Sequence, residues 1–236
     1  ISAAEHTMAM IMALSRNISL GHIGLMAGKW NRNDLVGNEL QRKKIGVVGL
    51  GKIGREVIKR ALSYDMKILG YDPFVNKDHF DDNEVKVVDL DTLTKECDYI
   101  TLHLPINDST RNLFDYDRLL MMKKTSKIIN VARGGIINED DLSKALNNEI
   151  ISGAAIDVFN KEPLDPKSNL ITSKNILLTP HLGASTFEAK EGVTLSVCNQ
   201  MIEFFNNGKL KNAINIPIAD TSLMNKLASY YQLAEL

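Results

Sequence analysis

The chain has 236 residues, 44% of them hydrophobic, with 28 Lys and Arg against 29 Asp and Glu. A net charge of −1 gives no electrostatic reason to bind nucleic acid or an anionic membrane, so we expect neither partner. The longest apolar stretch, residues 8–14, is too short to cross a bilayer. The only cysteines, Cys97 and Cys198, match no metal-ligand spacing, so we expect a cytoplasmic protein with reduced thiols and no metal.

The first 30 residues have helical periodicity. Ser2-Ala-Ala-Glu5 has the spacing of a capping box and predicts the start of a helix, and a second helical stretch follows to about Trp30. The chain begins at Ile1 without a methionine, and residues 223–236 have another helical pattern. We therefore expect a fragment of a longer protein.

From residue 45 onward, short apolar runs alternate with helical patterns. Strands are expected at residues 45–48, 68–71, 85–88, 99–102, 128–131, 154–158 and 176–178. Helices are expected at residues 52–62, 90–93, 117–122, 139–146 and 186–205. Because the strands are apolar throughout rather than alternating, they predict a parallel sheet covered by helices on both faces. The sequence thus predicts a doubly wound α/β fold, Rossmann-like, in which ligands bind beyond the carboxyl ends of the strands.

The first expected strand leads directly into Gly49-Leu-Gly51-Lys-Ile-Gly54 and a helix. In this strand–turn–helix context the three glycines predict a tight turn, close approach of a pyrophosphate and close packing of helix on strand. Asp72 follows the second strand, where a carboxylate accepts hydrogen bonds from ribose hydroxyls and repels a 2′-phosphate. These residues predict NAD as the cofactor rather than NADP; S-adenosylmethionine is an alternative ligand for such a crevice.

Three further strand ends have side chains suited to chemistry. Arg133 precedes two glycines after the fifth strand, and its planar guanidinium suits a substrate carboxylate. His181 follows the seventh strand and is the natural acid/base near neutral pH. Glu162, after the sixth strand, would favour the imidazolium form of that histidine and fix its orientation. Each residue alone is more often structural, but the combination predicts an active site.

These segments resemble the signature segments of the D-isomer-specific 2-hydroxyacid dehydrogenases, in the same order and spacing. They begin at Gly49, Tyr71 (Tyr-Asp-Pro), His103 (His-Leu-Pro), Asn130 (Asn-Val-Ala-Arg-Gly-Gly), Ile156 (Ile-Asp-Val-Phe-x-x-Glu-Pro) and Thr179 (Thr-Pro-His-Leu-Gly-Ala-Ser-Thr). The resemblance implies that Arg133 binds the substrate and that His181 transfers the proton. It also implies that Glu162 modulates the acidity of His181 and that Asp157 holds the nicotinamide carboxamide. It also implies that the cofactor is lined by Gly49, Gly51, Lys52, Ile53, Gly54, Asp72, Leu104, Pro105, Val131, Ala132, Arg133, His181, Gly183 and Ala184.

Within the family, residues 181–189 and 212–217 are most similar to the branch that oxidises D-3-phosphoglycerate for L-serine biosynthesis. The resemblance implies an NAD-binding domain at 1–188 with a helical dimerisation arm at 1–40, a return to the substrate domain at 189–217 and a further domain from 218 to 236. It implies a homodimer or higher homo-oligomer acting on a small molecule. The alternatives are another D-2-hydroxyacid dehydrogenase, a glyoxylate or hydroxypyruvate reductase, or an NAD(H)-sensing corepressor-type protein. Glu162 argues against formate dehydrogenases, in which the histidine's partner is a glutamine.

Overall fold

A computed structural model of the chain describes residues 1–75, 80–81, 84–208 and 211–212. The chain divides into two compact units, residues 1–184 and residues 185–236, which are described separately. The further domain predicted from residue 218 lies outside the described residues.

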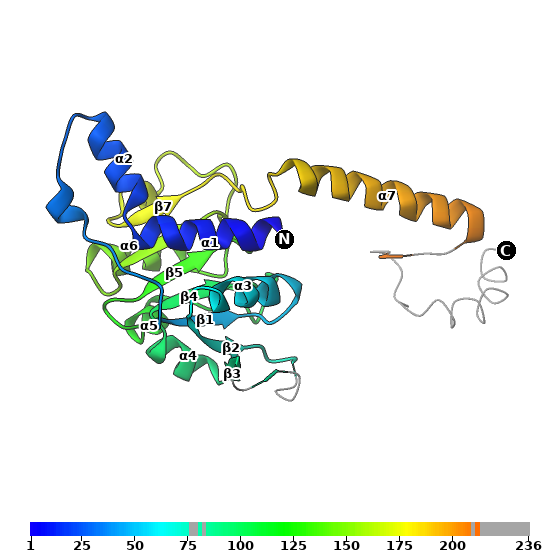
Figure 1. Ribbon diagram of the computed structural model, residues 1–236, viewed down its shortest axis with the longest axis horizontal. Coiled ribbons are helices and arrows are strands. Elements are labelled where there is room, and N and C mark those ends of the chain that lie inside the picture. The colour runs from blue at the N-terminus through cyan, green and yellow to red at the C-terminus, as the bar shows by residue number, and fades with distance from the viewer. Residues whose placement is uncertain (76–79, 82–83, 209–210, 213–236) are drawn as a thin grey trace. The chain divides into compact units, whose positions relative to one another are not determined.

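The first unit is built on a sheet of seven parallel strands (Figure 1). The strands are β1 (Lys44–Val48), β2 (Lys67–Tyr71), β3 (Val85–Val87), β4 (Tyr99–Leu102), β5 (Lys127–Asn130), β6 (Gly153–Ile156) and β7 (Ile176–Leu178). Their order across the sheet is β3-β2-β1-β4-β5-β6-β7. Each strand was predicted within two residues at each end, and the predicted doubly wound parallel fold is confirmed.

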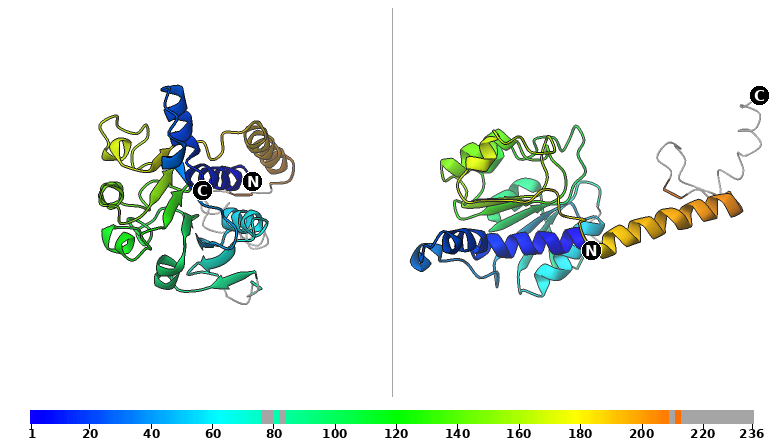
Figure 2. Two further views of the ribbon diagram at one scale, coloured as in Figure 1. Left: turned by 60° about the vertical axis from the view of Figure 1, so that its left-hand side comes forward. Right: turned by 90° about the horizontal axis from the view of Figure 1, so that it is seen from above.

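Helices cover both faces of this sheet. The helices of the first unit are α1 (Ser2–Ser15), α2 (Ile18–Met26), α3 (Lys52–Leu62), α4 (Leu90–Glu96), α5 (Tyr116–Leu120) and α6 (Glu139–Asn147), with 3-10 turns η1 (Arg32–Leu35) and η3 (Asn169–Thr172). From above, the sheet lies between α1 and α3 on one side and the green helices that include α6 on the other (Figure 2). Each face has its own core cluster, and the central strands β4, β5 and β6 are buried along their whole length. Burial on both faces explains why these strands are apolar without alternation.

The strand order places a topological switch point between β1 and β4. The chain leaves β1 toward β2 and β3, and then crosses to β4 on the other side of β1. The segments after β1 and β4 therefore diverge at the carboxyl edge of the sheet, which is where ligands bind in doubly wound folds. All the candidate site residues follow strands at this edge or lie in the first turn of α3.

Helix α1 packs into the core of the first unit. It begins at Ser2, but its N-cap is Ile1, so Ser2 does not occupy the N-cap position that the predicted capping box assigned to it. Glu5 pairs instead with Arg60 of α3, with 2.9 Å between its Oε1 and the guanidinium Nη2. Residues along α1 such as Met8 and Ile11 are buried in the same cluster as β1 and β5.

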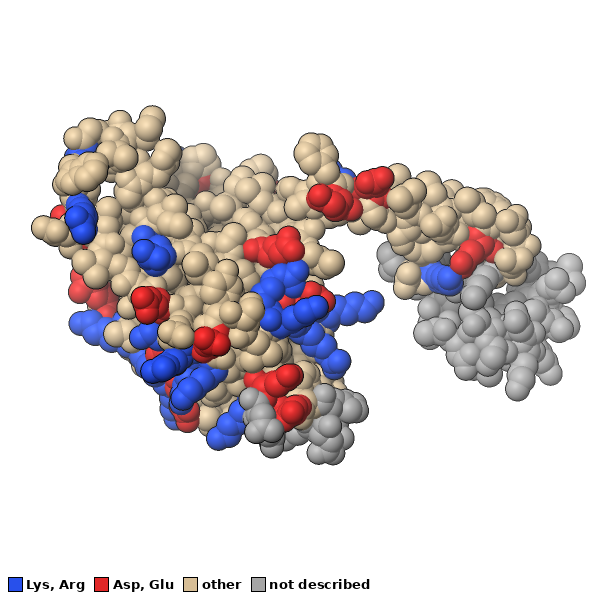
Figure 3. Space-filling model, in the orientation of Figure 1, with Lys and Arg blue, Asp and Glu red and all other residues tan. Residues whose placement is uncertain are grey.

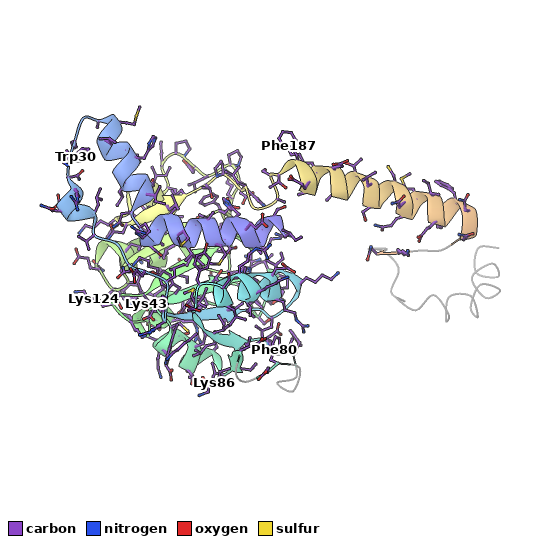
Figure 4. The ribbon with its side chains drawn as sticks, viewed as in Figure 1. Trp30, Lys43, Phe80, Lys86, Lys124 and Phe187 are labelled. Carbon is purple, nitrogen blue, oxygen red and sulfur yellow. The ribbon has the colours of Figure 1, made fainter. Side chains whose placement is uncertain are left out.

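Helix α2 and the segment after it differ from α1 because their apolar side chains are exposed. No residue of α2 is buried, and Ile23, Leu25, Met26 and Trp30 are each more than half exposed. The surface over α2 shows few charged side chains, and Trp30 lies beyond its end (Figures 3 and 4). This exposed surface is consistent with an arm that binds a second copy, but dimerisation stays a prediction.

The second unit contains one described helix, α7 (Phe187–Asn207). Thr186 caps it by accepting a hydrogen bond from the N–H of Ala189, and Gly208 ends it with a left-handed backbone at φ 62°. The sequence predicted this helix at 186–205. No described helix is both long and apolar enough to cross a membrane.

Candidate active site

The glycine-rich turn after β1 has the geometry that its sequence predicted. Gly49 has a φ of +100°, and a Cβ there would lie 2.5 Å from the carbonyl oxygen of His103. A Cβ on Gly54 would lie 2.0 Å from the carbonyl oxygen of Gly49, so the helix must approach the turn at a glycine. Gly51 differs, because nothing lies within 4 Å of its hypothetical Cβ. Gly49 and Gly54 are thus required by packing, whereas Gly51 leaves open space above the backbone.

That open space lies at the amino end of α3. Gly51 is the N-cap of this helix and supplies no side-chain hydrogen bond, so the first backbone N–H groups remain available to an anion. The side chains of Lys52 and Ile53 are exposed beside it. The residues present therefore fit a dinucleotide pyrophosphate.

Asp72 is tied to the same turn. Its carboxylate accepts hydrogen bonds from the N–H groups of Leu50 and Phe74, each at 2.9 Å. These bonds fix the carboxylate at the end of β2 next to the glycine-rich turn. The contact of Asp72 with a ribose stays a prediction.

The other residues predicted to line the cofactor follow β4, β5 and β7 at this edge. Leu104, Val131 and Gly183 are buried, Ala132 is half-buried, and Pro105 and Ala184 are exposed. Their contact with a cofactor stays a prediction.

His103 lies beside Gly49 at the switch point, and burial lowers the pKa of its imidazole to about 4. The His103 ring is therefore neutral at pH 7. It hydrogen-bonds the hydroxyl of Thr101 at 3.0 Å.

His181 and Glu162 form a direct hydrogen bond. The Nδ1 of His181 lies 2.7 Å from the Oε2 of Glu162, while Oε1 accepts a hydrogen bond from the N–H of Phe159 at 3.0 Å. Burial acts to raise the pKa of Glu162, but the hydrogen bonds from His181 and Phe159 and the nearby charges of His181 and Arg133 outweigh it and lower that pKa. Glu162 is therefore ionised at neutral pH. Both side chains are partly exposed, 49% for His181 and 36% for Glu162.

Arg133 lies at the same edge on a turn that buried groups hold in place. The side chain of Asn130 donates to the carbonyl oxygen of Arg133 and accepts from the N–H of Ala132. A Cβ on Gly134 would lie 1.9 Å from the carbonyl oxygen of Phe159, so only glycine allows the two turns to approach. The guanidinium itself is exposed, and its charge contributes to the lowered pKa of Glu162. Asn130 is a site-organising residue that sequence reasoning missed, although its place in Asn-Val-Ala-Arg marked it.

Asp157 is held by the segment that follows β7 and by α1. Its side chain is fully buried, and its oxygens accept hydrogen bonds from the hydroxyl of Thr179 at 2.6 Å and the N–H groups of Leu182 and Gly183 at 2.7 and 2.9 Å. It also contacts Nε2 of His6 at 3.2 Å. The structure shows a carboxylate that holds the 179–183 segment; its contact with a nicotinamide stays a prediction.

His6 is the second residue that sequence reasoning missed. It lies on α1, 151 residues before Asp157, and no local pattern connects the two. Nothing in the sequence around His6 indicates this contact. Among the described residues, no group of three or more His, Cys, Asp or Glu side chains is arranged to hold a metal ion.

Comparison with known proteins agrees with this geometry. The family model described as "D-isomer specific 2-hydroxyacid dehydrogenase, NAD binding domain" matches residues 8–183. The D-3-phosphoglycerate dehydrogenase of Synechocystis sp. is 45% identical over 235 residues, which cover 100% of this chain and 42% of that protein. The D-3-phosphoglycerate dehydrogenase of Methanocaldococcus jannaschii is 41% identical over 238 residues, covering 100% and 45%. The chain thus spans less than half the length of these relatives.

A solved structure is also similar to this chain. The NAD-dependent formate dehydrogenase of Staphylococcus aureus in complex with NAD is similar at a TM-score of 0.82 and 35% identity, over 89% of this chain and 63% of that one. With a family model that matches most of the chain, the chain belongs to the D-isomer specific 2-hydroxyacid dehydrogenases, as an NAD-binding domain of that family.

Proposed function

We propose that the protein containing this chain oxidises D-3-phosphoglycerate to 3-phosphohydroxypyruvate with NAD, a step of L-serine biosynthesis. The reaction class is supported chiefly by the 2.7 Å contact between His181 and Glu162 at the carboxyl edge of the sheet. The substrate is supported by the relatives named D-3-phosphoglycerate dehydrogenase, which match the whole chain at up to 45% identity.

In this proposal His181 moves the proton. Glu162 holds Nδ1, which leaves Nε2 to accept the hydroxyl proton of the substrate. The ionised Glu162 then stabilises the imidazolium that forms. Arg133 binds the substrate carboxylate with its exposed guanidinium. NAD, when bound, supplies the acceptor for the hydride that leaves C2.

The cofactor would be held by the glycine-rich turn and the amino end of α3, with Asp72 at the ribose. In this proposal the lining residues are Gly49, Gly51, Lys52, Ile53, Gly54, Asp72, Leu104, Pro105, Val131, Ala132, Arg133, His181, Gly183 and Ala184. We also propose that the protein is a cytoplasmic homo-oligomer, which is supported by two free cysteines and the exposed apolar side chains of α2.

The test is an assay of the full-length protein with NAD and a panel of D-2-hydroxyacids. We expect kcat/KM for D-3-phosphoglycerate to exceed that for D-lactate, glycolate and D-glycerate. Preference for glycolate or D-glycerate would identify a glyoxylate or hydroxypyruvate reductase. NADH binding without turnover on any member of the panel would favour a dinucleotide sensor and contradict the proposal.

The position of Asp72 predicts the choice between cofactors. We expect NADH to bind at least about tenfold more tightly than NADPH, because a 2′-phosphate beside a carboxylate costs on the order of 1 kcal/mol or more. Calorimetric titration of both dinucleotides measures this ratio, and Asp72→Asn should reduce it. Equal affinities in the unchanged protein would contradict the assignment of Asp72.

The lowered pKa of Glu162 predicts how its removal changes the pH profile. The carboxylate stays ionised below its ordinary pKa range, so at neutral pH His181 always has an anionic partner. In Glu162→Gln that anion is lost and the imidazolium becomes less stable. We expect the acidic limb of the kcat profile for hydroxyacid oxidation to move to lower pH, with a lower maximum. An unchanged profile in Glu162→Gln, measured beside Glu188→Gln as a control, would contradict the pairing.

A further inference from the structure

The backbone at His181 requires support from its surroundings. His181 has a φ of +54°, a left-handed conformation that is uncommon for residues other than glycine. Such a conformation persists only where surrounding contacts impose it. The N–H of His181 donates to the carbonyl oxygens of Asp157 and Thr179, at 2.8 and 3.0 Å. The direction in which the imidazole points toward Glu162 therefore depends on this turn.

The carboxylate of Asp157 holds the rest of the turn. It accepts hydrogen bonds from the next two backbone N–H groups, those of Leu182 and Gly183. The carbonyl oxygen and the carboxylate of Asp157 together accept hydrogen bonds from three consecutive N–H groups, those of residues 181–183. If the carboxylate rotated, two of them would lose their partners.

A fully buried carboxylate needs donors that replace its lost hydration. Besides the two backbone N–H groups, the hydroxyl of Thr179 donates to Oδ1 at 2.6 Å. Nε2 of His6 lies 3.2 Å from both that Oδ1 and Thr179 Oγ1. Because the carboxylate accepts and the hydroxyl proton of Thr179 is directed to it, Nε2 of His6 must carry a proton and donate. His6 is the only Lys, Arg or His in the described part of the chain that lies within 4 Å of this carboxylate.

His6 reaches this position because α1 packs on the sheet. Ala4, Met8 and Ile11 are buried on the face that covers β5 and β6, and His6 itself keeps only 20% of its side chain exposed. The imidazole is therefore anchored by a rigid helix rather than by a loop. We propose that His6 is a positioning residue for the proton transfer: it fixes Asp157 and Thr179, which in turn fix the left-handed turn that directs His181 toward Glu162. This inference rests on the proposed function, in which His181 moves the proton.

The experiment compares three variants of the full-length protein. His6→Leu removes the donor and replaces the imidazole with an apolar side chain of similar size. His6→Gln supplies an amide N–H near the position of Nε2. Glu5→Gln, the matched control, weakens the neighbouring Glu5–Arg60 contact of α1 and leaves His6 unchanged. We measure kcat, KM, NADH affinity, Tm and backbone hydrogen exchange of residues 181–184 in the absence of substrate.

In His6→Leu we expect kcat to fall about 10- to 100-fold, because a small displacement of an acid/base is sufficient for that loss. We expect NADH affinity to fall by a smaller factor than kcat, since Gly49, Gly51 and Asp72 lie outside the 181–184 turn, which supplies only part of the proposed cofactor lining. We expect exchange at 181–184 to accelerate about tenfold or more. His6→Gln should restore both kcat and exchange to within about threefold of the unchanged protein. Glu5→Gln should leave both within about twofold.

Three results would overturn the inference. They are unchanged exchange or unchanged kcat in His6→Leu, failure of a folded His6→Gln to restore them, and an equal loss in Glu5→Gln. If His6→Leu does not fold, His6→Asn, whose shorter amide cannot reach Asp157, replaces it. If the unchanged protein oxidises no hydroxyacid, the proposed function fails, whereas the exchange data still decide whether His6 holds the turn.

Discussion

His181→Ala in the full-length protein is expected to lower kcat by about two to four orders of magnitude, which is the usual contribution of a positioned acid/base. The imidazole is the group whose free Nε2 would accept the substrate proton, because Glu162 holds its Nδ1 at 2.7 Å. NADH affinity should change little, since the proposed pyrophosphate and ribose contacts lie at the ends of β1 and β2, whereas His181 follows β7. Steady-state kinetics and calorimetric titration of NADH measure the two effects separately.

The control for this experiment is His22→Ala, which removes an exposed histidine of α2. It should leave kcat within about twofold, because surface side chains away from a site contribute little. A loss in His181→Ala that appears only in KM, or a kcat within about tenfold of the unchanged protein, would mean that another group transfers the proton.

The chain of residues 1–236 by itself should bind NADH and yet oxidise D-3-phosphoglycerate at less than about 1% of the rate of the full-length protein. The glycine-rich turn, Asp72 and the strand-end segments lie within one compact unit, residues 1–184. Catalysis requires more, because the substrate must be held close to the reacting atoms in a site closed to water. In the first unit Arg133 is exposed, and His181 and Glu162 keep 49% and 36% of their side chains exposed.

The measurements are calorimetry with NADH, turnover, and sedimentation velocity of the 236-residue chain beside the full-length protein. We expect a dimer, because the exposed apolar side chains of α2 need a surface to cover them. Gly54→Val serves as the control for specific binding: a side chain there would collide with the carbonyl of Gly49, so NADH binding should be lost. Turnover by the chain alone near the full-length rate would show that the substrate site lies entirely within these residues.

The sequence alone determined the strands, the glycine-rich turn and the three strand-end candidates. These features are local or periodic: apolar runs identify buried parallel strands, and the spacing of Gly49, Gly51 and Gly54 specifies a turn whose geometry the structure reproduces. The meeting of Glu162 and His181 also followed, because the carboxyl ends of parallel strands share one edge.

The tertiary structure decided the features that depend on packing between distant segments. The pattern of helix α1 does not say which segments cover it, and only the folded chain shows that it packs against α3, β5 and β6. The contact of His6 with Asp157 joins residues 151 apart, and the four donors around that carboxylate come from two separate segments of the chain. No pattern within one segment encodes such contacts, because the free energy that selects them comes from burying a charged group among donors that only the folded chain brings together.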